Sequence, residues 1–294
     1  MGQSEDHGIP FVAYWNMGDE YQFNVEKRLE QWKDGKITKN EVSRYKATFK
    51  IIDSTATSYI VHWSYNLDLG KDHGIDPSIV ERSSKFNELE YQYRTDELGA
   101  FVELLNWEEV SNAMKDLVTQ MIDAVGEDDL AKREKVQGML EPMLPLFSSK
   151  DAIENLAMKE VQLIHYPFGV EFSTTDPLEY DEALPNLFGG DPIKARSKVS
   201  VSSVDRNEMR CVLQHQMSID PKEMKKIMNQ ALQKLELNAK EMESGKYNVR
   251  DENTFDYLYE TGVPVKIVAD RETIMSFGKI DGKRIDRTSI ELIQ

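Results

Sequence analysis

The residues best placed to form a binding site are aromatic and lie on two predicted strands. His62, Trp63 and Tyr65 fall in one segment of alternating polarity, and Tyr91 and Tyr93 fall in another. Because alternate residues of a strand share one face of a sheet, aromatic side chains at this spacing can line a pocket for an apolar ligand. The same spacing is typical of an ordinary aromatic core beneath helices, and both interpretations stay open.

The sequence contains no motif for catalysis, cofactor binding or metal binding. Its five histidines form no HxH or HExxH pair, and Cys211 is the single cysteine, which excludes an intrachain disulfide and a multi-thiolate zinc site. There is no Walker loop, no GxGxxG after a strand and no GxSxG elbow. We therefore predict no catalytic, cofactor or metal residues, and the alternative of a hydrolase with a dispersed site stays open.

Composition narrows the class of protein and of partner. The 294 residues are 40% hydrophobic and 30% charged, with 36 basic and 52 acidic side chains and a net charge of −16. This apolar content is enough for a packed core, and the acidic balance argues against nucleic acid as a partner. No apolar run approaches the roughly 20 residues of a membrane-spanning helix, so we predict no transmembrane segment.

Strands that should hold the aromatic residues recur as hairpins. Tyr45–Ile51 and Tyr59–Tyr65 alternate with period two around a turn at 53–55, and Leu89–Tyr93 and Phe101–Leu105 flank Gly99. Further alternating segments predict strands at 199–201, 209–215, 255–259, 263–269, near Ile274, and at 285–292.

Helices interrupt these strands in blocks. Asn106 can cap a helix from Trp107, two more helices are predicted before residue 157, and Asp220-Pro221 opens a long one ending at Gly245. Because helices and strands do not alternate one by one, we predict an α+β fold. Its curved antiparallel sheets would be built from hairpins with helices packed against them.

The chain is expected to divide near residue 165. Residues 11–165 would form an N-terminal α+β half, and 166–294 a C-terminal half that begins with a crossing rich in Pro and Gly; the halves could also pack as one unit. Lys46–Trp63 matches Lys198–His215 in alternation, which suggests an internal duplication of one plan. Chance similarity between two amphipathic hairpins is the competing explanation.

Three segments carry a resemblance to known families. Leu89–Glu109, Pro185–Gly190 and Glu260–Lys266 resemble parts of an uncharacterised, lipoprotein-like family of exported proteins from Bacteroidetes-type bacteria. The strand–xTGxPxK–strand pattern around Gly262 also resembles a hairpin of the LolA-like lipoprotein carriers, whose sheets are antiparallel and curved. The first resemblance implies an exported protein whose signal peptide has been removed.

Together these observations favour a non-enzymatic, periplasmic, cell-surface or secreted protein. It would bind a hydrophobic ligand or a protein partner, with His62, Trp63, Tyr65, Tyr91 and Tyr93 as the candidate pocket. The polar start of the sequence, which lacks an apolar signal region, leaves a cytoplasmic location as the alternative. A structural or assembly role in the cell envelope is the third possibility.

Overall fold

The computed structural model describes residues 8–66, 90–124, 130–184, 191–226, 246–277 and 280–293. Strands dominate it. The first strands are β1 (Ile9–Pro10), β2 (Glu20–Lys33), β3 (Lys36–Ser54), β4 (Ser58–Asn66), β5 (Glu90–Asp96) and β6 (Phe101–Leu104). The helical segment contains α2 (Trp107–Ala124), α3 (Leu130–Leu140), the 3-10 helix η2 (Glu141–Ser148), α4 (Lys150–Ala157) and α5 (Lys159–His165). The last strands are β7 (Glu171–Phe172), β8 (Leu178–Leu184), β9 (Ile193–Asp205), β10 (Arg210–Ile219), β11 (Lys246–Leu258), β12 (Val263–Phe277) and β13 (Ile280–Leu292).

Among the described residues, eleven strands hydrogen-bond in the order β6-β5-β4-β3-β2-β13-β12-β11-β10-β9-β8. Strands β1 and β7 form a separate two-stranded sheet. Neighbours such as β11 and β12, or β4 and β5, run antiparallel. The predicted antiparallel sheet is therefore confirmed, and strand is a larger share of the chain than helix.

The chain divides into two compact units. The first, here the carboxy-terminal unit, comprises Met1–Phe11, Glu26–Val42 and Val170–Glu291. The second, here the helical unit, comprises Val12–Val25, Ser43–Gly169 and Leu292–Gln294. Each unit is discontinuous in sequence, since Glu26–Val42 belongs to the carboxy-terminal unit and Leu292–Gln294 to the helical unit.

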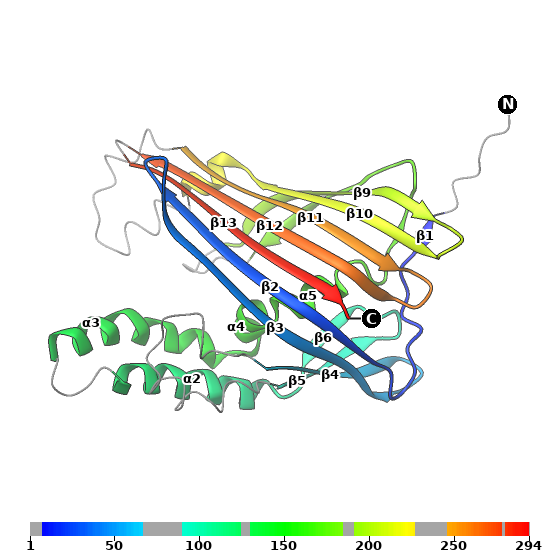
Figure 1. Cartoon of the computed structure of the whole chain (residues 1–294), viewed down its shortest axis with the longest axis horizontal. Coiled ribbons are helices and arrows are strands. Elements are labelled where there is room, and N and C mark those ends of the chain that lie inside the picture. Colours follow the sequence, from blue (N-terminus) through cyan, green and yellow to red (C-terminus); the bar gives the residue numbers. More distant parts are fainter. Residues whose placement is uncertain are drawn as a thin grey trace. The chain divides into compact units, whose positions relative to one another are not determined.

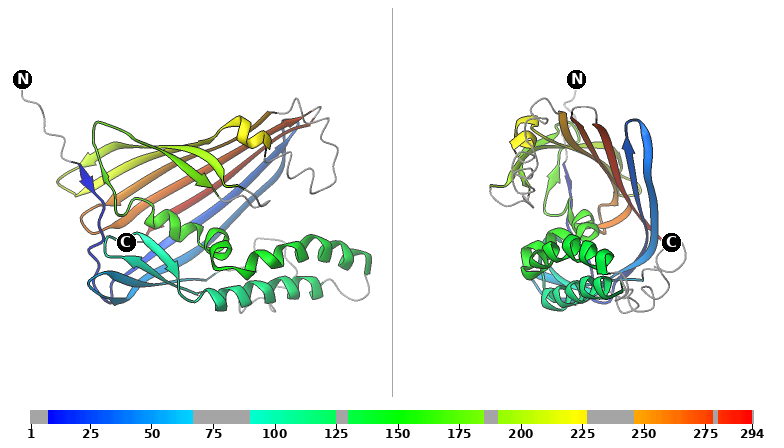
Figure 2. Two further views of the ribbon diagram at one scale, coloured as in Figure 1. Left: turned by 180° about the vertical axis from the view of Figure 1, so that it is seen from behind. Right: turned by 90° about the vertical axis from the view of Figure 1, so that its left-hand side faces the viewer.

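The helical unit is built on the two hairpins predicted from alternation. Phe49 pairs with Trp63 across β3 and β4, and Trp63 pairs with Tyr91 across β4 and β5. The turn before β6 contains Gly99, whose φ of 94° lies in the left-handed region that favours glycine. Helices α2 and α3 run side by side in Figure 2.

Long strands β9 to β13 dominate the carboxy-terminal unit (Figure 1). Apolar residues alternate with polar ones along β10, where Cys211, Leu213, His215, Met217 and Ile219 are buried. A bulge in the pairing of β9 with β10 interrupts the register between Val212 and Leu213. One face of this sheet is therefore a core face, and the opposite face carries mostly polar and charged side chains.

Several strands are longer than sequence alternation predicts. Strand β2 was not predicted, and β12 is continuous through the charged stretch Asp270–Glu272. The crossing rich in Pro and Gly, with which the predicted C-terminal half begins, contains β8. Residues 221–226 begin the predicted long helix, and the rest of it lies outside the described residues. In β12 the reason is cross-strand pairing: Arg271 lies opposite Asp251, and Asp270 opposite Arg287.

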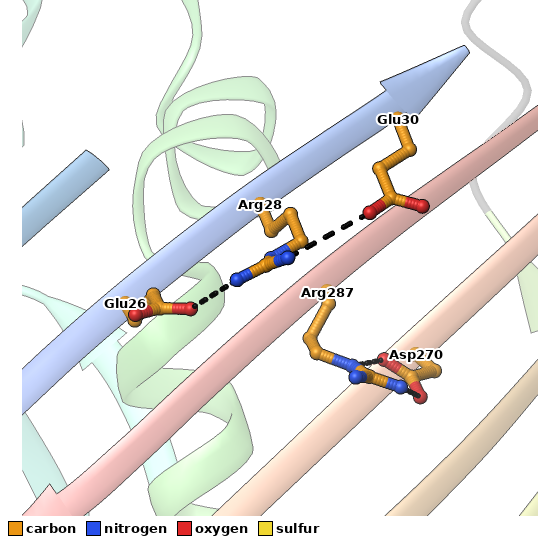
Figure 3. A network of polar contacts seen from close by, with 5 residues as sticks. All are labelled: Glu26, Arg28, Glu30, Asp270 and Arg287. Atoms are coloured by element: carbon orange, nitrogen blue, oxygen red, sulfur yellow. Dashed lines mark hydrogen bonds and ion pairs between the residues drawn. The ribbon is translucent and has the colours of Figure 1, made fainter. Parts of the chain in front are cut away.

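Ion pairs cover the charged face of β2, β12 and β13 (Figure 3). Arg28 lies 3.3 Å from Glu26 and 3.8 Å from Glu30, while Arg287 donates two hydrogen bonds of 2.6 and 2.5 Å to Asp270. The guanidinium side chains are 39% and 51% exposed, so each pair should contribute no more than about 1 kcal/mol. These weak, partly exposed pairs accommodate the charged side chains on this face of β2, β12 and β13.

Candidate functional site

Four of the five residues predicted to line a pocket share one face of the helical unit. Trp63 lies opposite Tyr91, and Val61 lies opposite Tyr93; the side chains between them are partly buried on β4 and exposed on β5. His62 points to the other face, where its Nε2 lies 3.1 Å from Glu90. The structure thus brings the aromatic residues together and leaves His62 apart from them.

Tyr65 and Tyr91 form the outer part of this aromatic group. Their hydroxyl groups lie 3.1 Å apart, and the ring of Tyr45 lies 5.4 Å from that of Tyr65. Burial raises the pKa of Tyr65 and, more strongly, of Tyr91, and both burial and the Glu160 carboxylate raise the pKa of Tyr45. All three phenols therefore stay protonated at neutral pH, and of the Tyr65 and Tyr91 hydroxyls one donates to the other.

Tyr93 extends the group to a buried histidine that sequence patterns did not single out. His165 Nδ1 lies 2.7 Å from the Gly99 carbonyl, which can only accept, so Nδ1 carries the proton. Nε2 then accepts a hydrogen bond of 2.8 Å from the Tyr93 hydroxyl. Burial lowers the pKa of His165 to about 4, against smaller opposing effects of Gly99 and Asp96. The imidazole is neutral and fully bonded.

Aromatic rings enclose this histidine. Trp15 lies 5.8 Å from the His165 ring, Phe168 also 5.8 Å and Phe49 6.1 Å, measured between ring centroids. Trp63 and Tyr93 are at most 1% exposed. Side chains of the protein itself fill the space around these rings, so the arrangement is that of a structural aromatic core.

A second buried histidine lies in the carboxy-terminal unit. On the core face of its sheet, here called the buried face, His215 lies opposite Asn253 on β11. Asn253 Nδ2 donates to His215 Nδ1 at 2.9 Å, so the proton is on Nε2, which donates to Ser197 Oγ at 3.1 Å. Ser197 in turn donates to Glu182 at 2.7 Å.

The direction of these hydrogen bonds decides their chemistry. Activation of a serine nucleophile requires an imidazole nitrogen that can accept the hydroxyl proton. Here His215 donates to Ser197, and the proton of Ser197 points to Glu182. Burial lowers the pKa of His215 despite the nearby Glu182 and Asp251 carboxylates, so the ring is neutral at pH 7. The network satisfies buried polar groups and is not arranged as a catalytic triad.

Charged pairs lie beside this network on the buried face. Arg271 donates two hydrogen bonds of 2.7 Å to Asp251, and Arg284 donates two of 2.6 Å to Asp286. The two arginine side chains are 42% and 49% exposed. Solvent therefore reaches the buried face at β12 and β13, although Ser197 and His215 are almost inaccessible.

Farther along the same face, apolar side chains form a group that we call the Tyr247 cluster. Its members are Ala195, Met217, Ile219, Met224, Tyr247 and Val249, with Leu184, Ile193 and Met275 packed against it. Tyr247 is 6% exposed, and its hydroxyl has no hydrogen-bond partner among the described residues. A buried phenol without a partner is unfavourable, because folding removes its bonds to water without replacing them. Among the described residues of the buried face, this hydroxyl is a fully buried polar group that lacks a hydrogen bond.

Within the described ranges, no group of three His, Cys, Asp or Glu side chains is arranged to hold a metal ion. No helix among those residues is both long and apolar enough to cross a membrane. Cys211 is buried on β10, and burial raises the pKa of its thiol to about 11. The thiol is therefore protonated at neutral pH, which argues against a role as nucleophile.

Comparison with known proteins gives distant structural likenesses. No family model matches the sequence, and no curated protein does. The structure is similar to a lipovitellin structure entitled "Lipid-protein interactions in lipovitellin", with a TM-score of 0.44, 10% identity and 95% of this chain covered. The match spans 25% of the lipovitellin chain. The attachment invasion locus protein Ail of Yersinia pestis matches with a TM-score of 0.17, 4% identity, and coverage of 95% of this chain and all of Ail.

Proposed function

We propose that the protein binds an amphipathic, lipid-like molecule on the buried face of the carboxy-terminal unit. The apolar chain of this ligand would lie against the Tyr247 cluster. The observation that carries the proposal is the Tyr247 hydroxyl, buried among apolar side chains without a partner in the described chain. A ligand with a polar group next to its chain would supply the missing hydrogen bond.

The composition of the Tyr247 cluster suits such a chain. Met217, Met224 and Met275 are unbranched and polarisable, and methionine adapts its shape to different apolar partners. Each methylene that leaves water contributes about 0.8 kcal/mol, so a short contacted stretch of chain is enough for measurable affinity. The solvent-accessible pair Arg271–Asp251 lies on the same face, and Asp251 follows Val249 as the next residue of β11 on that face. A polar head group would therefore reach water.

Binding is favoured over catalysis by the state of the candidate catalytic groups. His215 donates to Ser197 and cannot take its proton, while His165 is enclosed by the aromatic core. The aromatic residues Trp63, Tyr65, Tyr91 and Tyr93 would then stabilise the helical unit, and the ligand would contact the carboxy-terminal unit. This division moves the proposed pocket away from the residues that sequence patterns favoured.

The proposal extends to cellular location and family. We place the protein with exported, lipoprotein-like proteins of Bacteroidetes-type bacteria, in the periplasm or at the cell surface, because of the resemblance at 89–109, 185–190 and 260–266. We also propose that the sheet is curved with helices packed against it. Strands β9–β10 would repeat the plan of β3–β4, as an internal duplication. A lipid-like ligand fits a compartment bounded by membranes.

Tyr247→Phe tests the proposed function directly. The variant lacks the unpartnered hydroxyl, so its free energy of unfolding without ligand should be about 1 kcal/mol higher than that of the wild type. Affinity for 1-monomyristoylglycerol, measured by isothermal titration calorimetry, should fall roughly fivefold to tenfold because one hydrogen bond to the ligand is lost. These opposite changes distinguish a ligand-binding hydroxyl from a purely structural one.

Tyr65→Phe is the matched control, because the Tyr65 hydroxyl already lies 3.1 Å from that of Tyr91. This variant should lose about 1 kcal/mol of stability and keep the wild-type affinity. If the wild-type protein does not bind monomyristoylglycerol, or if Tyr247→Phe leaves the affinity unchanged, the proposed site is wrong.

A further inference from the structure

We infer that the head group of the ligand carries an ammonium group, which pairs with Glu182. The inference rests on the proposed function and adds the chemical class of the head group. It starts from the position of Glu182 at the border of the Tyr247 cluster. Glu182 lies opposite Ala195, and Leu184 is the next residue of β8 on the same face. Ala195 belongs to the cluster, and Leu184 packs against it.

The carboxylate of Glu182 has an incomplete set of partners. Among the described residues its one hydrogen bond comes from Ser197, at 2.7 Å, and no Lys, Arg or His nitrogen lies within 4.0 Å of it. His215, the nearest titratable group of β10, is neutral because burial lowers its pKa. A negative charge beside an apolar surface is stabilised by a cation, and no cation of the described residues is in direct contact with this carboxylate.

Neighbouring cations are already bound to other carboxylates. Arg271 feels the charge of Glu182, but its Nε and Nη2 atoms are both bonded to Asp251. Arg284 is bonded to Asp286 in the same way. Two guanidinium groups thus stand beside the three carboxylates of Glu182, Asp251 and Asp286, and these five groups sum to 2 − 3 = −1, with Glu182 as the carboxylate that no guanidinium group bonds. An anionic head group is therefore disfavoured, and a cationic group is favoured.

Strand topology gives this pairing a suitable geometry. Strand β8 is the last strand in the hydrogen-bonding order, so Glu182 lies at an edge of the sheet, whereas Tyr247 lies on the interior strand β11. A ligand with its ammonium group at Glu182 and its chain against the Tyr247 cluster would keep the charge partly hydrated and the chain buried. Glu182 is only partly buried, which is compatible with a head group that stays in contact with water.

The test compares two lipids that differ in the ammonium group. Myristoyl lysophosphatidylcholine and myristoyl lysophosphatidylglycerol share the chain and the phosphate, and both are titrated below the concentration at which they form micelles. We expect the wild-type protein to bind the choline lipid about fivefold more tightly, as for a partly exposed ion pair. Glu182→Gln should reduce this preference to less than about twofold.

Glu179→Gln is the matched control. Glu179 is on the same strand as Glu182 but on the opposite face, where Arg196 donates to it at 3.0 Å. This variant loses the same charge and should keep the fivefold preference. If the wild-type protein binds both lysolipids and monomyristoylglycerol equally well, the head-group inference fails and the proposed function stands. If it binds none of them, both fail. A preference that persists in Glu182→Gln would assign the ammonium group to another carboxylate and overturn the inference.

Discussion

The free energy of unfolding is expected to fall by about 1.4 kcal/mol per pH unit between pH 6.5 and pH 4, through His165 alone. In the folded protein the pKa of this histidine is about 4, while the unfolded chain has the ordinary value of 6.5. The unfolded state therefore binds one more proton in this window, and stability declines as the pH falls. The full effect is about 3 kcal/mol, and it is complete below pH 4.

Urea denaturation from pH 7.5 to pH 4, with His165→Gln as the reference, isolates this effect from the titration of carboxylates. The stability difference between the wild type and the variant should shrink as the pH falls. His215→Gln serves as the second control, because burial lowers the pKa of His215 as well and its contribution should be separate. Parallel stability curves for the wild type and His165→Gln would contradict a buried neutral imidazole.

Gly99→Ala should destabilise the helical unit by about 3 kcal/mol or more. At a φ of 94° any L side chain is strained, at a cost of about 1 to 2 kcal/mol. In addition, the new Cβ would lie 2.7 Å from the Ala13 Cβ and 2.9 Å from a ring carbon of Phe168. Any shift that relieves these contacts also moves the Gly99 carbonyl, which accepts the hydrogen bond that His165 Nδ1 donates.

Gly18→Ala separates the two causes. Gly18 has the same φ of 94°, but an added Cβ would meet no atom within 4 Å. The control should therefore cost only the backbone strain of about 1 to 2 kcal/mol, and the difference between the variants measures the steric contact. Equal destabilisation in both variants would show that the packing of Gly99 against Ala13 and Phe168 has no energetic role.

Sequence alternation predicted the hairpins well where one face is apolar and the other polar. The pairing of Phe49 with Trp63 is an example, because burial of one face sets the register. Alternation failed for β2, where Arg28 pairs with Glu26 and Glu30 of its own strand, and for the middle of β12, where Arg271 pairs with Asp251 of the neighbouring strand. A single sequence cannot identify such pairs before the register is known.

The candidate site was harder to predict than the fold. Tyr93 was singled out for its place in an alternating strand, but its partner His165 is 72 positions away and belongs to a helix. Tyr247 and Glu182 have ordinary sequence contexts. Their significance comes from bonds that they lack in the folded chain, and no local pattern records an absent partner. Cross-strand registers were needed to place both residues on one face.

The most direct test of ligand binding at the Tyr247 cluster is an NMR titration of protein labelled with [methyl-13C]methionine. On addition of monomyristoylglycerol, the methyl signals of Met217, Met224 and Met275 should shift together and saturate. The signal of Met158, which is buried in the helical unit, should stay in place, as should that of exposed Met17. Shifts confined to Met158 or Met17, or no shifts at saturating ligand, would contradict the proposed site.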